Sequence, residues 1–312
     1  MRSDFVVRCI PVATLVLVCG CHKESPAPVE FRGLTTLTAA QAKVLAVQEP
    51  RLELNGLTTL SDEAATALAT HYGELKLNGL TTLSDSAARA LARHDGHLEL
   101  NGLAELSNKA AESLAKHDGH LMLRGLVSLP DKQAKAFGRH RGRLVLSGLT
   151  TLSVKAAEAL SQQKGELYLG GLTTLSPEVA EALAQHEGLL LLNGVTTLSD
   201  DEAEALARHK GRLLLNGVTS LSDRATEALA GHDGGLVLFG LTTLSDRQAE
   251  TFAGHTGELW LVGLTTLSDG VAQTLAKHKG HLRLDGLTSL SSEAAAALRA
   301  NNEIVLPEAF RL

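Results

Sequence analysis

The stretch Gly73–Asp95, GELKLNGLTTLSDSAARALARHD, contains in 23 residues every element from which the fold can be argued. Leu75 and Leu77 flank Lys76 with the period-two alternation of a short strand that is apolar on one side. Residues 79–83 follow as a glycine-led turn that still carries leucines. A strand therefore passes into a turn within a few residues.

The second half of the same stretch has the signals of a short helix. Ser84 is suited to act as the N-cap, and Asp85 follows in the first turn, where a negative charge favours the helix dipole. His94 lies in the last turn, and Gly96 is the expected C-cap. The helix shows a narrow apolar stripe at i, i+3 and i+4, made by Ala88, Leu91 and Ala92.

This unit repeats with a constant period. One glycine recurs every 23 residues, and we call it the period glycine; it stands at 33, 56, 79, 102, 125, 148, 171, 194, 217, 240, 263 and 286. A second glycine precedes most of these by six residues, from Gly73 to Gly280. Repeats of this length predict a solenoid, because no single unit can bury its apolar face without its neighbours.

Positions that stay leucine in every repeat are expected to form the core. The residue four after the period glycine is leucine in all twelve units, and the main helix position is leucine or phenylalanine. Parallel strands stack at about 4.8 Å and packed helices at about 8–10 Å, so the helical side must fan out. The predicted fold class is α/β: a curved right-handed solenoid of about twelve strand–turn–helix repeats, with a parallel sheet on the concave face and helices on the convex face. It is expected to fill residues 29–312, with a C-terminal cap from about residue 301.

The strand with two leucines, the leucine-rich turn and the single helix resemble the leucine-rich-repeat superfamily. The segment Leu57–Ala64 is most similar to a 23-residue bacterial class first described in spirochaete and oral-bacterial surface proteins, and the whole unit resembles repeats of predicted planctomycete-type lipoproteins. The usual buried asparagine is replaced here by the leucine and valine column that runs from Leu34 to Leu287. The resemblance implies binding of proteins or glycans at the cell envelope.

The N-terminal residues predict export and a lipid anchor. An apolar run of about ten residues is too short to span a bilayer but suits a secretory signal. It ends in Val18-Cys19-Gly20-Cys21, which resembles the lipobox of bacterial lipoproteins. We expect residues 1–20 to be the signal peptide, Cys21 to be lipidated, and residues 21–28 to hold the tether. The protein would then lie in the cell envelope, outside the cytoplasm, in a membrane leaflet that the sequence leaves open.

Composition argues against several classes of function. The chain carries 29 basic and 35 acidic residues, and this balance does not favour nucleic acid as a partner. No P-loop, serine elbow or zinc-protease helix occurs, and the serines and threonines fall in regular columns. We expect a non-catalytic protein without a cofactor or a dedicated metal site.

Histidine occupies the helix-end position in nine repeats, from His71 to His278. One interpretation is a ladder of metal ligands. The other, which we favour, is that these side chains hydrogen-bond the last helix carbonyls, since Gln163 and Asn301 fill the same position elsewhere. Three repeats add a second histidine three residues later, as in His94 and His97, and such a pair provides only two of the four ligands that structural zinc requires.

The residue between the two strand leucines must point outward, onto the concave face. We call this position, three before each period glycine, the central column. It starts charged, is apolar over seven repeats, and ends charged at Arg283. The candidate binding patch comprises its apolar members and two neighbours: Met122, Val145, Tyr168, Leu191, Leu214, Val237, Phe239, Trp260 and Val262.

The patch favours a binding module that presents its concave surface to a protein or glycan partner, because large exposed apolar patches and aromatic anchors mark interfaces. Two alternatives remain open. The chain could be a structural or self-associating envelope component without a specific ligand. The apolar run could also reflect no more than the strand propensity of β-branched and aromatic residues.

Overall fold

A computed structural model describes residues 33–47 and 50–311. The predicted signal peptide, Cys21 and the tether lie outside the described residues. In the described part, twelve helices alternate with twelve strands, one of each per repeat. The helices are α1 (Ala39–Leu45), α2 (Asp62–Leu68), α3 (Asp85–Leu91), α4 (Asn108–Leu114), α5 (Asp131–Phe137), α6 (Val154–Leu160), α7 (Pro177–Ala184), α8 (Asp200–Leu206), α9 (Asp223–Ala230), α10 (Asp246–Ala253), α11 (Asp269–Leu275) and α12 (Ser292–Arg299).

The strands form a single open sheet. All are parallel and lie in chain order, so each repeat pairs only with the one before and the one after. They are β1 (Arg51–Glu53), β2 (Tyr72–Lys76), β3 (Asp95–Glu99), β4 (Leu121–Met122), β5 (Leu144–Val145), β6 (Leu167–Tyr168), β7 (Leu190–Leu191), β8 (Leu213–Leu214), β9 (Leu236–Val237), β10 (Leu259–Trp260), β11 (Leu282–Arg283) and β12 (Ile304–Val305), followed by the 3-10 helix η1 (Glu308–Phe310).

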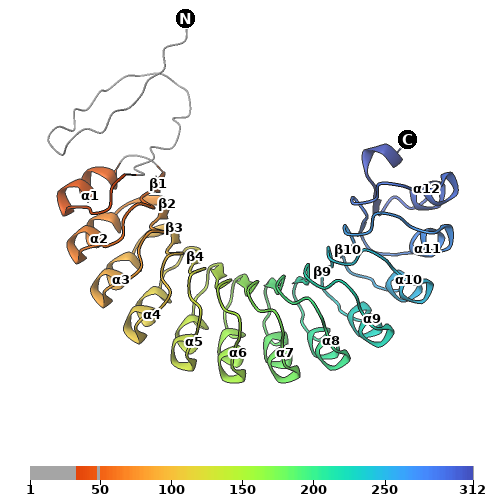
Figure 1. Ribbon diagram of the computed structural model, residues 1–312, viewed down its shortest axis with the longest axis horizontal. Helices are drawn as coiled ribbons and strands as arrows, with labels where there is room; N and C mark the ends of the chain where they lie inside the picture. The colour runs from red at the N-terminus through yellow and green to blue at the C-terminus, as the bar shows by residue number, and fades with distance from the viewer. Residues whose placement is uncertain (1–32, 48–49, 312) are drawn as a thin grey trace, which may run out of the picture.

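Figure 1 shows the result as an arc, with the strands along its inner side and the helices along its outer side. Equivalent leucines align across the sheet: Leu121 pairs with Leu144, and Leu144 with Leu167, each 23 residues further on. This geometry follows from the wider spacing that helices need compared with strands. The structure confirms the predicted α/β solenoid with a parallel sheet on the concave face.

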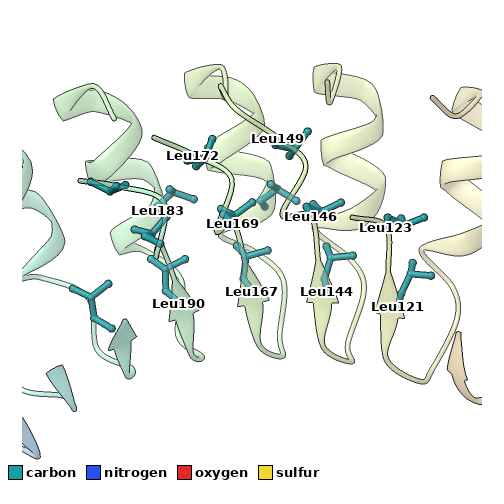
Figure 2. Close-up of a cluster of buried hydrophobic side chains, with 14 of the residues drawn as sticks. Leu121, Leu123, Leu144, Leu146, Leu149, Leu167, Leu169, Leu172, Leu183 and Leu190 are labelled. Carbon is teal, nitrogen blue, oxygen red and sulfur yellow. The ribbon is translucent and has the colours of Figure 1, made fainter. Parts of the chain in front are cut away.

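The core is a continuous stack of leucines between the sheet and the helices (Figure 2). Each coil contributes the two strand leucines, the leucine after the period glycine and the helix leucine. In the repeat around β6 and α7 these are Leu167, Leu169, Leu172 and Leu183, all at most 1% exposed. Full burial of such a side chain contributes roughly 1.5–3 kcal/mol.

The helices begin where the sequence predicts. Ser84 caps α3 by accepting a hydrogen bond from the backbone N–H of Ala87 at 2.9 Å. The Ser84 hydroxyl also donates to the carboxylate of Asp62 in the preceding repeat, so the cap links neighbouring coils. The apolar stripe is shifted slightly, because Ala87 and Ala88 are fully buried whereas Ala92 is only partly buried.

The predicted role of Gly96 as a helix C-cap is wrong. Helix α3 ends at Leu91 and is capped by Ala92 in a right-handed conformation, while Gly96 lies inside β3 with φ +139°. A Cβ atom on Gly96 would lie 1.9 Å from the carbonyl oxygen of Gly73. The second glycine column therefore allows the backbones of successive coils to approach closely, which a side chain would prevent.

Candidate binding site on the concave face

The central column lies on the strands, which form the inner side of the arc (Figure 1). Met122, Tyr168, Leu191, Leu214 and Trp260 are partly buried there. Their chain neighbours, the strand leucines, are fully buried on the opposite side of the sheet. The alternation of a strand therefore places the predicted residues on one surface.

The remaining members of the patch differ in exposure. Val145 and Val237 are only 2% exposed, whereas Phe239 is 37% exposed and Val262 is partly buried. Valine is shorter than the tyrosine and tryptophan of this column, so it sits lower between longer side chains. The two valines form part of the floor of the patch and add little surface that a partner can contact.

Tyr168 is held in place by two charged side chains. The Arg143 guanidinium lies 5.1 Å from the centre of the tyrosine ring, within the range of a cation–π contact. The Tyr168 hydroxyl donates to Glu166 at 3.0 Å, and Arg143 Nε donates to the same carboxylate at 2.5 Å. The hydrogen bond from Arg143 lowers the pKa of Glu166, while burial raises the pKa of Tyr168. The ring is therefore fixed before any partner arrives.

Trp260 is held in the same way. Its indole Nε1 donates to Glu258 at 2.6 Å, and Arg212 donates to that carboxylate at 2.8 Å. The Arg212 and Arg283 guanidinium carbons lie 4.2 and 4.4 Å from the ring centre. Phe239 stacks beside it, with ring centroids 6.0 Å apart and planes inclined by 8°.

Arg212 reaches Trp260 across an intervening repeat. The equivalent position of that repeat is Gly235, where a Cβ atom would lie 3.2 Å from Arg212 Cγ and 3.5 Å from Glu258 Oε2. The first distance is tighter than ordinary van der Waals contact, so a Cβ here would push Arg212 aside by a few tenths of an ångström, and a larger side chain would compete with it for the same space. Gly235 thus leaves open the path by which Arg212 joins Glu258.

An apolar stretch lies between the Tyr168 cluster, with Arg143 and Glu166, and the Trp260 cluster, with Arg212 and Glu258. Between Tyr168 on β6 and Trp260 on β10 the central column contributes Leu191, Leu214 and Val237. Four strand spacings separate the aromatic residues, which corresponds to roughly 19 Å. The surface can thus offer an apolar strip with a rigid aromatic residue and an arginine–glutamate pair at each end.

The first strands carry an ion-pair network instead. The Lys76 ammonium lies 3.5 Å from Glu53, 3.3 Å from Glu74 and 3.4 Å from Glu99. Burial would lower the pKa of Lys76, but Glu99 and Glu74 outweigh it, and the net shift is upward. This end of the face is polar and internally paired.

Two groups of residues were not found from the sequence. The first comprises the supporting charges: Arg143, Glu166, Arg212, Glu258 and Arg283. A signal for part of it was present, since GELYL (165–169) and GELWL (257–261) place glutamate two residues before each aromatic residue.

The second group is an asparagine ladder beside the central column. The Asn78 side-chain oxygen accepts from the backbone N–H of Asn101 at 3.0 Å, and Asn55 does the same for Asn78 at 3.2 Å. The sequence had led us to expect no asparagine ladder, because the leucine and valine column occupies the usual position. In this protein the asparagines lie one residue before the period glycine.

The prediction that each histidine bonds the last carbonyls of its own helix is wrong in its partner, because the bonds go to the preceding coil, some to the end of its helix and some to its strand. His255 Nδ1 lies 3.0 Å from the Ala230 carbonyl oxygen at the end of α9, and His94 Nε2 lies 3.0 Å from Gly73 O. The nine imidazoles are 1–3% exposed. Burial is the main cause that lowers the pKa of His94, and it lowers that of His209 to about 4, with the neighbouring histidines adding to the effect.

The second histidines point elsewhere. His97 is exposed and stacks on His120 of the next repeat at 4.1 Å, so it does not form a pair with the buried His94. Among residues 33–47 and 50–311, no three histidine, cysteine or acidic side chains are grouped so that they could hold a metal ion.

None of the described helices has the length and apolarity needed to span a bilayer.

Comparison with known proteins gives the following similarities. No protein-family model matches the chain, and no curated protein matches it. A leucine-rich-repeat protein of Leptospira interrogans is 18% identical with a TM-score of 0.40, covering 93% of this chain and 92% of that one. An internalin of Listeria monocytogenes is 12% identical with a TM-score of 0.45, covering 87% and 89%. A chain of the Drosophila Toll–Spatzle complex is 14% identical with a TM-score of 0.44, covering 84% of this chain and 42% of that one.

The repeats themselves define the class. Twelve parallel strands in chain order, twelve short helices and a stacked leucine core make the protein a leucine-rich-repeat-like α/β solenoid with an open sheet. A solenoid of this kind offers an extended concave surface suited to protein binding.

Proposed function

We propose that the protein is a non-catalytic binding module whose concave face captures a protein partner between Tyr168 and Trp260. The observation that carries this proposal is the fixed position of both aromatic rings, each held by an arginine and a glutamate. A side chain that is ordered before binding loses little conformational entropy when it meets a partner. Aromatic and arginine side chains are also the commonest energetic anchors of protein interfaces.

The arrangement around Trp260 favours a protein over a glycan. The guanidinium carbons of Arg212, two repeats before Trp260, and of Arg283, one repeat after it, lie within 4.4 Å of the ring centre, and Phe239 stacks beside it. A sugar that stacks on tryptophan needs a free ring face, and these contacts leave little of one. An apolar strip with polar ends suits the side chains of a protein segment.

We also propose that the module is held at the cell envelope, outside the cytoplasm, by lipid attached to Cys21. The motif Val18-Cys19-Gly20-Cys21 supports this, as does the lack of any other cysteine after residue 21. Metabolic labelling with a fatty-acid analogue should mark the wild-type protein and miss Cys21→Ala. Equal labelling of both would refute the anchor and would leave the concave site unaffected.

The binding proposal is tested by removing both aromatic anchors. Tyr168→Ala combined with Trp260→Ala should abolish capture of the partner that the wild-type protein retains in a pull-down or proximity-labelling experiment. The unfolding transition should change little, since both side chains lie outside the leucine core. Glu53→Ala, in the same column at its charged end, is the matched control and should bind normally.

Two results would contradict the proposal. Undiminished capture by the double variant would show that the concave clusters do not bind. Concentration-dependent self-association of the purified wild type that the double variant abolishes would assign the strip to contacts between copies, and the protein would then be a structural envelope component.

A further inference from the structure

A second candidate site lies on the convex side, between α4 and α5, which are neighbours on the outer side of the arc (Figure 1). A cavity of about 400 Å³ opens there to solvent. Its floor contains Ala115, Ala136 and His117, all at most 8% exposed. Small-molecule sites span about 300–1,000 Å³, so this cavity lies at the lower end of that range.

The walls of the cavity are strongly basic. Five cationic side chains line it and only two acidic ones, Glu112 and Asp118; the cations are Lys116, Lys132, Lys135, Arg139 and Arg141. Lys132 pairs with Glu112 at 3.6 Å. Lys116, Lys135, Arg139 and Arg141 form no ion pair with any of the residues that the structure describes. This excess contrasts with the net charge of −6 of the whole chain.

The basic walls also break the repeat. The column of Lys135 carries glutamate in six other repeats: Glu112, Glu158, Glu181, Glu204, Glu227 and Glu250. Several of these pair with a basic residue twenty positions later, as Glu204 does with Arg224 at 2.7 Å and Glu227 with Arg247 at 2.8 Å. Lys135 has Lys155 at the corresponding position. The attraction that other repeats have at this position is therefore missing between α5 and α6, and Lys135 is left without an acidic partner beside the cleft.

The like charges that line the cleft repel one another, and an anion bound among them would relieve this repulsion. Among the twelve repeats, only the one that starts at Gly125 is basic at all four positions that line the cavity, namely Lys132, Lys135, Arg139 and Arg141. Packing does not require these charges, because all four side chains are exposed. Guanidinium and ammonium groups arranged around a concave site are the groups that bind phosphates and carboxylates.

We propose that the cleft between α4 and α5 binds a multiply charged oxyanion of the phosphate-ester type. Arg139 and Arg141 supply planar guanidinium donors, and Lys116, Lys132 and Lys135 supply ammonium groups that line the same cleft. The site is separate from the concave face and does not depend on the function proposed for that face. The ligand is either a soluble phosphate compound or the headgroup of an anionic lipid.

Inorganic pyrophosphate is the probe for a direct test by calorimetric titration of the full-length protein. Arg139→Gln with Arg141→Gln should weaken its binding by about tenfold or more, the loss expected when charge-assisted hydrogen bonds are removed. The matched control is Arg208→Gln with Lys210→Gln, which removes two charges from the same two columns three repeats further on. The control should bind pyrophosphate nearly as well as the wild type.

A second arm identifies the source of the anion. If the ligand is a lipid headgroup, vesicles of phosphatidylglycerol should displace bound pyrophosphate and vesicles of phosphatidylcholine should not. No displacement by either assigns the cleft to soluble phosphate compounds. Absence of measurable pyrophosphate binding, or equal weakening in the two double variants, would overturn the proposal, since the charges would then act only as general surface charge.

Discussion

Replacing His209 with glutamine should make the stability of the protein less sensitive to acid. His209 is 1% exposed, and burial together with His186 and His232 lowers its pKa to about 4 from an ordinary value of 6.5. The folded state therefore holds this ring neutral at pH values where the unfolded chain protonates it. Stability is fully present above pH 6.5, falls as the pH drops from 6.5 towards 4, and reaches a plateau below 4.

The size of the effect follows from the two pKa values. At pH 5 the unfolded chain gains about 2 kcal/mol from protonating this one histidine, whereas the folded state gains almost nothing. Glutamine does not titrate, and Gln163 already occupies the same column, where its side chain donates to the Gly142 carbonyl. The His209→Gln protein should thus lose about 2 kcal/mol less than the wild type between pH 7.5 and pH 5.

Urea denaturation at the two pH values, followed by circular dichroism, measures this difference. His281→Gln is the control. The His281 side chain is exposed at the concave side of β11, so this substitution removes one histidine without disturbing the buried column. The control should show the wild-type difference between the two pH values. An identical loss of stability in wild type and His209→Gln would refute the account of a neutral buried histidine.

Two further substitutions test the packing. Leu183→Ala removes a fully buried helix leucine and should lower the free energy of unfolding by roughly 2–5 kcal/mol in denaturant titrations; a loss below about 1 kcal/mol would contradict its place in the core. Gly96→Ala places a Cβ 1.9 Å from Gly73 O at φ +139° and should lower the free energy of unfolding by more than about 1–2 kcal/mol. Gly33→Ala is the control, because a Cβ there would meet nothing within 4 Å, and it should leave thermal unfolding nearly unchanged. Equal melting temperatures for the two glycine variants would show that close approach of the coils does not require Gly96.

The arrangement of the coils could be predicted from the sequence because each inward position has the same task in every repeat. The leucines two and four residues before Gly171 lie inside, as predicted. The leucine four after the period glycine, which we expected in the core because it is constant, is only partly buried in most repeats and packs against the core, as Leu83 and Leu175 do. Contacts between coils could not be assigned in the same way. When every repeat carries the same residue, the sequence does not show whether His255 contacts its own helix or the previous one. The structure shows the previous one, through Ala230.

The candidate site could be predicted only in part for a related reason. The period-two alternation shows that Tyr168 and Trp260 point outward, but not what surrounds them. Arg143 is one repeat away from its ring and Arg212 is two repeats away, and long side chains can reach either distance. The near-complete burial of Val145 likewise depends on the length of its neighbours and cannot be inferred from the direction of its strand.

We therefore infer that departures from the repeat mark the candidate sites of this chain. Folding requires uniform columns, since each coil builds the same core against the next, and it does not require any outward column to vary. Gly235 illustrates the argument. Glycine weakens a strand by removing a side chain that would pack, so the fold alone gives no reason to place it on the concave face. Because glycine has no side chain, Arg212 can extend past this position to bind the Glu258 carboxylate. The same carboxylate accepts the hydrogen bond that holds Trp260 in place.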